Sequence, residues 1–274
     1  MRWSRWLRDY DIDRLDQRDP EWIDFLYRTF HAFVERYYKA EVRGMDRIPP
    51  GAALYVGNHN ALIMTPESFI FGFALYRERG LADMPYGLGH EFAISIPPLK
   101  QIVVPLGAVR AGHRVALALF GAGHKVLVFP GSEFDSMRSW RDRDRVRFGG
   151  RKGFMKLALT AGVPIVPVVA AGAQETLFVL SDGQRIARAL GLDRLIRVKC
   201  WPVSIAIPWG LMVGPWPFIP WPTRVLMEVL PPLRFERSGP EAAADPDYVA
   251  ECAAKVESTM QDCLTRLAAE RRSM

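Results

Sequence analysis

The sequence predicts an α/β protein: a single mixed, mostly parallel β-sheet covered by helices, with a helical extension at the N-terminus. From residue 51 onward, apolar runs of strand length alternate with runs of helix length, which is the pattern of strands joined by helices. No internal repeat or low-complexity linker interrupts it. We therefore expect a single α/β domain over residues 48–274, preceded by an extension over residues 1–47.

The individual elements follow from local signals. Strands are expected at residues 52–56, 85–88, 102–109, 126–129 and 165–169, and helices at 65–77, 112–124 and 154–161. Asp245-Pro246 predicts the start of a last helix over residues 246–271, because aspartate caps a helix N-terminus and proline suits its first position. The apolar face of this helix carries Val249, Cys252, Val256, Cys263 and Leu267.

The N-terminal extension is expected to contain a helix that begins at Asp19-Pro20, by the same capping argument. An apolar stripe follows at helical spacing, made of Trp22, Leu26, Phe30, Phe33 and Tyr37. The stripe fits a helix packed on its own core as well as one that faces a membrane. Further upstream, basic and apolar side chains lie together in a way that favours a short interfacial anchor: Arg2, Trp3, Arg5, Trp6, Leu7 and Arg8.

Composition narrows the classes of function. The 274 residues carry a net charge of +6, and a basic surplus suggests an anionic partner such as nucleic acid, a membrane or a phosphorylated ligand. Nucleic acid is not expected, because stacking on bases needs interleaved aromatic residues, and the basic run 138–152 has only Trp140 and Phe148. The three cysteines, Cys200, Cys252 and Cys263, have no metal-ligand spacing. No metal site is expected.

One segment breaks the alternating pattern. Between Lys199 and Arg224 there is no charged residue, and residues 200–223 hold four of the eight tryptophans together with several prolines. The prolines exclude a regular membrane-spanning helix, while tryptophan favours a boundary between apolar and polar surroundings. We expect a loop that enters a bilayer or lines an acyl-chain tunnel; an irregular segment packed on the core is the alternative. Attachment would be peripheral or monotopic, at the cytoplasmic face of a membrane.

The strongest local signal is G-N-H-N-A-L-I-M-T-P-E over residues 57–67. His59 directly follows an expected buried strand and precedes a helix, and ligands of α/β sheets bind at the carboxyl ends of strands. A neutral imidazole at that place can take a proton from a hydroxyl nucleophile. By itself a histidine at a strand end is more often structural, so the neighbouring segments decide.

Four segments in order resemble the conserved blocks of the glycerolipid acyltransferase superfamily, from about residue 48 to 232. Asn58-His59 resembles the start of N-H-x-x-x-x-D, and P-L-G-A-V-R ending at Arg110 resembles the second block. V-F-P-G-S-E ending at Glu133 resembles the F-P-E-G block, and residues 163–168 resemble V-P-I-V-P-V. Arg151 and Lys152 match the usual approach to the fourth block.

This resemblance implies an O-acyltransferase in which His59 is the general base on an acceptor hydroxyl. The hydroxyl attacks the thioester of acyl-CoA or acyl carrier protein, which is a co-substrate, and no cofactor is implied. The acceptor would be a lysophospholipid or a neutral glycerolipid. The resemblance also implies a set of substrate-binding residues: Asn58, Arg110, Pro130, Gly131, Ser132, Glu133, Arg151 and Lys152.

Two departures from the family pattern matter. Met64 stands where the family has the aspartate that orients the histidine. Glu67 is the nearest acid and our predicted partner of His59; Glu91 and a base without any carboxylate remain alternatives. In the third block the acid is displaced to Glu133 and the next arginine is Arg138, which resembles the diacylglycerol acyltransferase and related neutral-lipid branch.

Arg110 and the residues from Arg138 to Lys152 could still hold a phosphate. Alternatively, the arginines of that run could pair with Asp142 and Asp144 in a solvated loop. A non-catalytic lipid-binding protein derived from the same fold is the rival function, motivated by Met64. The sequence does not predict the acyl chain length, the choice of donor or the oligomeric state.

Overall fold

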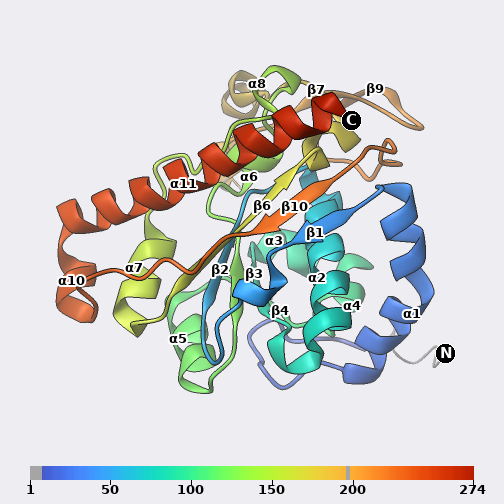
Figure 1. The fold of residues 1–274 in the computed structure, drawn as a ribbon. Helices are drawn as coiled ribbons and strands as arrows, with labels where there is room; N and C mark the ends of the chain where they lie inside the picture. Colours follow the sequence, from blue (N-terminus) through green and yellow to red (C-terminus); the bar gives the residue numbers. More distant parts are fainter. Residues whose placement is uncertain (1–7, 196–197) are drawn as a thin grey trace.

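The structure is a computed structural model that describes residues 8–195 and 198–274 (Figure 1). Its centre is a seven-stranded sheet with the strand order β1-β10-β6-β2-β5-β3-β4. The strands are β1 (Glu41–Arg43), β2 (Leu54–Gly57), β3 (Tyr86–Gly89), β4 (Ala108–Arg110), β5 (Val126–Val128), β6 (Ile165–Ala171) and β10 (Leu226–Val229). Five neighbours, β6 to β4, are parallel, and β10 runs antiparallel to β6. The predicted mixed, mostly parallel sheet is confirmed.

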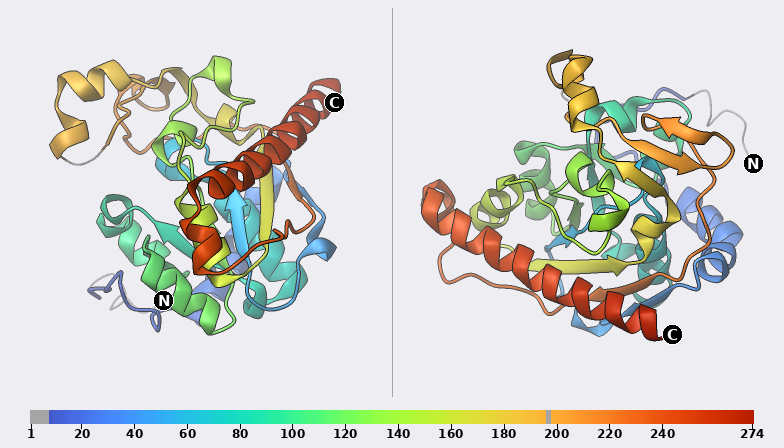
Figure 2. Two further views of the ribbon diagram at one scale, coloured as in Figure 1. Left: turned by 90° about the vertical axis from the view of Figure 1, so that its left-hand side faces the viewer. Right: turned by 90° about the horizontal axis from the view of Figure 1, so that it is seen from above.

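Two layers of helices cover this sheet because its central strands are apolar on both faces. Leu54 and Val56 of β2 pack into a core with α5 (His113–Gly121), α7 (Gly153–Ala161) and the long α11 (Pro246–Ser273). Ala53 and Tyr55 point to the other face, against α2 (Pro66–Arg79). Helix α1 (Pro20–Tyr37) packs outside α2 (Figures 1 and 2).

The predicted helix starts at Asp19 and Asp245 are both capped by the aspartate. The Asp19 carboxylate accepts a hydrogen bond from the Trp22 amide at 3.0 Å, and that of Asp245 accepts from Asp247 and Tyr248. Short helices complete the chain: α3 (Glu91–Ser95), α4 (Leu99–Val103), α6 (Glu133–Ser136), α8 (Gln184–Ala189), α9 (Leu192–Leu195) and α10 (Pro240–Ala244), with 3₁₀ turns at Met45–Arg47, Leu62–Met64, Leu81–Asp83, Trp140–Asp142 and Ala173–Thr176.

The strand expected over residues 102–109 is wrong in its first half. Residues up to Val103 belong to α4, a turn follows, and only Ala108–Arg110 form a strand. A short apolar run does not distinguish a strand from a buried helix segment. Pro105 cannot donate to a sheet, and Gly107 has a φ of 107°, so the chain turns between the two elements.

The uncharged segment 200–223 is not an irregular loop throughout, as its prolines had suggested. It supplies β8 (Val203–Ala206) and β9 (Gly210–Val213), which form an antiparallel hairpin. With β7 (Phe178–Ser181) the hairpin makes a second, three-stranded sheet, at the top of the view in Figure 1. The prolines fall outside the two strands, which is where a sheet tolerates them.

The N-terminal region contributes more to the body of the protein than expected. Residues 41–43, inside the predicted extension 1–47, form β1 of the main sheet. The apolar stripe of α1 is divided: Trp22 and Leu26 are buried, while Phe30 and Phe33 are 44% and 60% exposed. The interfacial anchor predicted over residues 2–8 lies outside the described residues except for Arg8. Among the helices that the structure describes, none is long and apolar enough to cross a bilayer.

Candidate active site

The site forms where three adjacent parallel strands end. His59 follows β2, the segment Phe129–Glu133 follows β5, and Gln174 follows β6. The strand order β6-β2-β5 places His59 between the other two segments. Side chains that are far apart in the sequence therefore meet at one edge of the sheet, where α/β proteins bind their ligands.

His59 contacts Glu67, the acid predicted as its partner. The Nδ1 atom of His59 lies 2.9 Å from Oε1 of Glu67, and the side chains are 18% and 2% exposed. The Asn60 amide lies 3.1 Å from the same carboxylate oxygen and 3.2 Å from Nδ1. Because the carboxylate favours a proton on Nδ1, which then has no lone pair, we assign the amide hydrogen bond to Glu67. This leaves Nε2 as the basic nitrogen.

The loop between His59 and Glu67 explains why residue 64 is not the partner. Ala61, Leu62 and Thr65 all have positive φ, at 50°, 58° and 38°, a conformation that is costly for residues with a Cβ. The loop turns Met64 toward the apolar cluster beneath the second sheet. Glu67 instead reaches His59 from the first turn of α2. Glu91, the alternative partner, lies 2.9 Å from Arg110 and not on the histidine.

The imidazole of His59 also has an aromatic neighbour. The ring of Phe129 stacks on it, with centroids 4.7 Å apart and an interplanar angle of 21°. Gly57 makes this contact possible, because a Cβ at that position would lie 2.5 Å from the Phe129 ring. The sequence contained Phe129 within the third block, but only the structure shows that it fixes the plane of the histidine.

A fully buried ion pair holds the main chain on both sides of His59. Asp135 accepts a hydrogen bond from the His59 amide at 2.6 Å, and Arg138 donates to the His59 carbonyl oxygen at 2.6 Å. The two side chains are 3.1 Å apart and 0% exposed. Arg138 also donates to the Asn60 side-chain oxygen. The pair therefore acts as a clamp on the histidine backbone, and we call it the Asp135–Arg138 clamp.

Burial dominates the electrostatics of this clamp. It raises the pKa of the Asp135 carboxyl, against the opposing charge of Arg138 and the hydrogen bond from the His59 amide. It lowers the pKa of the Arg138 guanidinium, against the charges of Asp135 and Glu67. Arginine nevertheless remains protonated in proteins, and a buried charge requires a partner. We therefore take Asp135 as the carboxylate that neutralises Arg138.

Two amides connect the His59 loop to β6. The Asn58 side chain donates to the Ala170 carbonyl at 2.9 Å and accepts from the Ala170 amide at 2.8 Å. Gln174 accepts from the Ala61 amide at 2.9 Å and donates to the Arg138 carbonyl at 2.9 Å. Because Asn58 is 0% exposed and both of its polar ends are occupied, the structure makes it a positioning residue in place of the substrate-binding residue expected from the resemblance.

The third block lies beside this machinery. Arg151 donates to Glu133 at 2.7 Å and to the Gly131 carbonyl at 2.9 Å, with Pro130 close by. Burial alone would raise the pKa of the Glu133 carboxyl, but the hydrogen bond and charge of Arg151 hold it below its ordinary value. Ser132 turns the chain with a φ of 46°. The structure thus brings together five of the predicted residues, and Lys152 is exposed at the start of α7.

Other predicted contacts lie elsewhere. Arg110 pairs with Asp13 and Glu91, both at 2.9 Å, at the end of β4, which is the edge strand of the sheet. Arg138 is fully buried in the Asp135–Arg138 clamp, so it is not available to hold a phosphate. Within the rest of the basic run, Arg145 and Arg147 approach Asp142 at 3.7 and 4.0 Å, as in the self-paired loop that the sequence left open. Arg143 pairs instead with Glu175, outside the run.

The described part of the chain has neither a group of side chains suited to a metal ion nor a reactive thiol. No group of histidine, cysteine, aspartate or glutamate there has the arrangement that could hold a metal ion. All three cysteines are buried and unpaired with one another. Burial raises the pKa of the Cys200 thiol to about 12, so it stays protonated and is a poor nucleophile.

Comparisons with known proteins show what this chain is similar to. Residues 39–171 match the family model described as Acyltransferase. An uncharacterized protein of Mycobacterium leprae is 29% identical over 278 residues, which cover 99% of this chain and 71% of that protein. A protein of Mus musculus described as a DGAT1/2-independent enzyme synthesizing storage lipids is 29% identical over 139 residues, 50% of this chain and 40% of its own length.

A solved structure shares the fold. The 1-acyl-sn-glycerophosphate (LPA) acyltransferase PlsC from Thermotoga maritima superposes with a TM-score of 0.52 and 17% identity, over 90% of this chain and 82% of that one. The matched family region contains His59, Glu67 and the Asp135–Arg138 clamp. The four sequence blocks and the family match agree: residues 39–171, which contain these residues of the site, form an Acyltransferase-family domain.

Proposed function

We propose that the protein is a membrane-associated O-acyltransferase with His59 as its general base. It would move a fatty acyl group from the thioester of acyl-CoA or acyl carrier protein to the hydroxyl of a glycerolipid. The observation that carries the proposal is the 2.9 Å contact between Nδ1 of His59 and the nearly buried Glu67. This contact leaves Nε2 free to accept a proton, and it stabilises the imidazolium that results.

The proposed step balances as follows. Nε2 of His59 removes the proton of the acceptor hydroxyl while its oxygen attacks the thioester carbonyl carbon, forming the ester C–O bond. The tetrahedral intermediate then collapses and the C–S bond breaks. The imidazolium returns its proton to the leaving thiolate, which departs as a thiol. No acyl-enzyme forms, and Glu67 remains a carboxylate throughout.

The charges around the third block favour an acceptor without a phosphate. Arg151 is engaged by Glu133 at 2.7 Å, and Arg138 is buried in the clamp. The arginine charges nearest to the block are thus already neutralised inside the protein. Among the acceptors that the sequence left open, we favour a neutral mono- or diacylglycerol over a lysophospholipid.

The rival function, a lipid-binding protein without activity, was motivated by Met64. The 2.9 Å contact of Glu67 with His59 supports a carboxylate partner for the base despite Met64 and so argues against that rival. A binding protein would have no use for a base paired with a buried carboxylate.

The experiment is transfer of a labelled acyl group from acyl-CoA or acyl carrier protein to a panel of mono- and diacylglycerols, fatty alcohols and lysophospholipids. His59→Ala should lower turnover about 10²–10⁴-fold, the usual contribution of a general base. His113→Ala, which removes an exposed histidine of α5, is the matched control. A folded His59→Ala variant with normal turnover, or a wild-type protein that binds lipids and transfers nothing, would refute the proposal.

A further inference from the structure

Large apolar side chains are exposed mainly in one stretch of the chain. Of the sixteen exposed large hydrophobic residues among the described positions, eleven lie between residues 180 and 221. They are Leu180, Leu190, Leu195, Ile205, Ile207, Trp209, Leu211, Val213, Trp216, Ile219 and Trp221. Single exposed apolar residues are ordinary, but a concentration of this size marks an interaction surface.

The β8–β9 hairpin carries apolar side chains on both faces, with Ser204 as a polar residue on the inner one. Its inner face, with Ala206 and Met212, packs on Ala61 and Leu62 of the His59 loop. Its outer face carries Ile205 and Leu211, which are cross-strand partners and are 42% and 66% exposed. A strand with one face in water normally alternates apolar and polar residues. This hairpin departs from that rule on its outer face.

Two of the exposed tryptophans, Trp209 and Trp216, have hydrogen-bonded indole N–H groups. The indole N–H of Trp209 donates to the Pro217 carbonyl at 2.6 Å, and that of Trp216 donates to the Val213 carbonyl at 3.0 Å. The rings are nonetheless 56% and 58% exposed. Because an indole with a bonded N–H presents only apolar surface, these rings can enter an apolar medium without leaving an unsatisfied donor.

The apolar surface continues onto α1. The Tyr37 hydroxyl donates to the Pro220 carbonyl at 2.6 Å, and the Tyr37 ring stacks on Phe33 with centroids 5.2 Å apart. Phe33 is 60% exposed. Two segments that are 183 residues apart in the sequence are therefore in contact, at the end of α1, which lies toward the second sheet in Figure 1.

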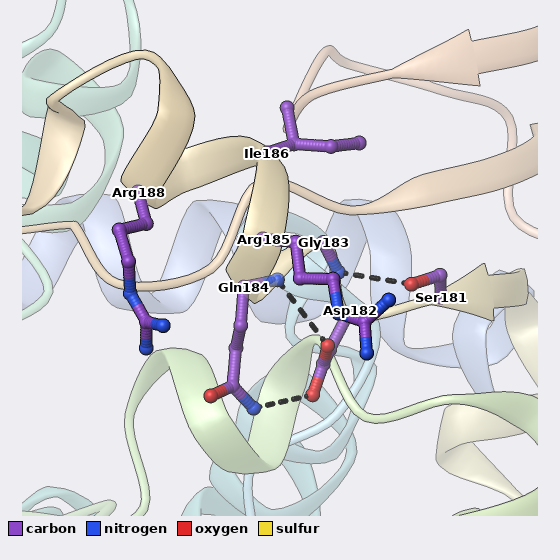
Figure 3. Close-up of a pocket in the computed structure, with 7 residues that line it drawn as sticks. All are labelled: Ser181, Asp182, Gly183, Gln184, Arg185, Ile186 and Arg188. Atoms are coloured by element: carbon purple, nitrogen blue, oxygen red, sulfur yellow. Dashed lines mark hydrogen bonds between the residues drawn. The ribbon is translucent and has the colours of Figure 1, made fainter.

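The part of the sequence that supplies most of this surface has a basic surplus. From residue 194 to 227 the sequence has four basic residues and no acidic one. On α8, Arg185 and Arg188 are exposed, and Figure 3 shows Ile186 pointing to the opposite side from Arg188. The neighbouring acid, Asp182, is occupied by hydrogen bonds from Gln184. An apolar area with basic residues beside it matches an anionic bilayer, whose surface attracts cations and whose interior accepts apolar side chains.

We propose that the outer face of the β8–β9 hairpin, the tryptophan-rich segment after it and the exposed end of α1 form one docking surface for an anionic lipid bilayer. The inner face of the same hairpin contacts the His59 loop, so docking would hold the site at the lipid surface, where an apolar acceptor is dissolved. This docking surface is the membrane contact of the proposed acyltransferase. The proposed function supplies the reason for docking, but the surface itself can be tested without it.

The first test measures binding to sedimenting vesicles of phosphatidylcholine with phosphatidylglycerol. Ile205→Thr with Leu211→Thr keeps strand-forming residues and should weaken partitioning about tenfold or more, because two large apolar contacts are lost. Ile96→Thr is the matched control, since Ile96 is also 42% exposed and lies outside the surface. Equal partitioning of the double variant and the wild type would overturn the proposal.

The second test separates the electrostatic contribution to vesicle binding from the apolar one. Arg185→Gln with Arg188→Gln should weaken binding to anionic vesicles several-fold at low salt, and the effect should shrink as salt screens the charges. Arg114→Gln on α5, at the opposite end of the molecule in Figure 1, should change nothing. Binding to neutral vesicles as strong as to anionic ones, or complete loss of wild-type binding at high salt, would contradict the mixed apolar and basic surface.

A third measurement does not depend on a hairpin variant folding. Vesicles with bromine-labelled acyl chains should quench the tryptophan emission of the wild-type protein, and Trp209→Phe should reduce the quenching more than Trp140→Phe. Sedimentation without vesicles covers the competing occupant, a second copy of the chain: a dimer that the Ile205→Thr, Leu211→Thr variant abolishes would overturn the lipid assignment.

Different variants should lose membrane docking and acyl transfer. His59→Ala should bind vesicles normally while losing acyl transfer. The hairpin variant should keep its transfer to a short-chain acceptor that is soluble in water, while losing transfer to an acceptor presented in vesicles. Loss of both activities in the folded hairpin variant would assign the hairpin to the catalytic site and refute a docking role.

Discussion

Nδ1 of His59 and Oε1 of Glu67 are 2.9 Å apart across a loop of seven residues, and the carboxylate is almost completely buried. The loop has three residues with positive φ, and the first turn of α2 places the acid. The contact is therefore a product of the fold of residues 59–67 and not of a fixed spacing between a histidine and an aspartate.

The contact predicts a specific kinetic effect. A carboxylate that orients a base acts mainly in the transition state, when the imidazole becomes charged. Glu67→Gln should lower kcat about 10²-fold or more and leave the KM for the acyl donor nearly unchanged. Steady-state kinetics of Glu67→Gln and the control Glu91→Gln test this. Full turnover in Glu67→Gln would remove the acid from the site.

Moving the acid to the family's usual position should not restore activity. Met64 packs against the apolar cluster beneath the second sheet, so Met64→Asp would bury an unpaired charge there. We expect Met64→Asp with Glu67→Gln to be no faster than Glu67→Gln, and less stable in denaturant. A clear recovery of turnover would mean that the loop can rearrange to bring residue 64 to His59.

The Asp135–Arg138 clamp predicts a large loss of stability from a small change. Asp135→Asn removes the one carboxylate that contacts the buried Arg138, and breaking a buried pair in this way costs about 3–5 kcal/mol. Asp135→Asn combined with Arg138→Met should recover part of this loss, because no charge is then left unpaired. Urea unfolding of the three proteins measures both effects. A single variant as stable as the wild type would show that the pair is not coupled.

The stacking of Phe129 on His59 requires a glycine at position 57. A Cβ at residue 57 would lie 2.5 Å from the Phe129 ring, so Gly57→Ala must displace the ring that stacks on His59. We expect turnover to fall about tenfold, as small misplacements of catalytic groups do. Gly87→Ala in β3 is the control, since nothing lies within 4 Å of its added Cβ. Equal activity of the two variants would show that the stacking has no effect on the base.

The ion pairs of Glu228 should make the stability of the folded protein depend on pH. Its carboxylate binds Arg266 at 2.6 Å and Arg47 at 3.0 Å, which joins α11 and the N-terminal region to β10. Burial alone would raise the pKa of Glu228, but these hydrogen bonds and charges lower it below its ordinary value of 4.5. A lowered pKa means that the stabilisation is complete above pH 4.5 and is lost as the pH falls through the folded-state value.

Thermal unfolding of Glu228→Gln measures this contribution. The variant should be less stable than the wild type at neutral pH, and the difference should narrow as the pH falls below 4.5. A difference that stays constant between pH 7 and pH 3 would show that the two arginines do not stabilise the ionised form of Glu228.

The sequence by itself determined the central strands of the sheet, the helix starts and the family resemblance. Helix caps at Asp19 and Asp245, the apolar strands and the four blocks in order were sufficient, because each depends on residues that are close together in the chain. His59 could be named for the same reason, since it stands within a block at the end of a strand.

Only the tertiary structure decided which side chains surround that histidine. Phe129, Asp135, Arg138 and Gln174 follow other strands, and they reach His59 because parallel neighbours end at one edge of the sheet. An Asp-x-x-Arg spacing occurs by chance, so it gave no signal of a buried pair. The hairpin in the segment 200–223 was hidden for a related reason: outward-facing apolar residues erase the alternation by which a half-exposed strand is recognised.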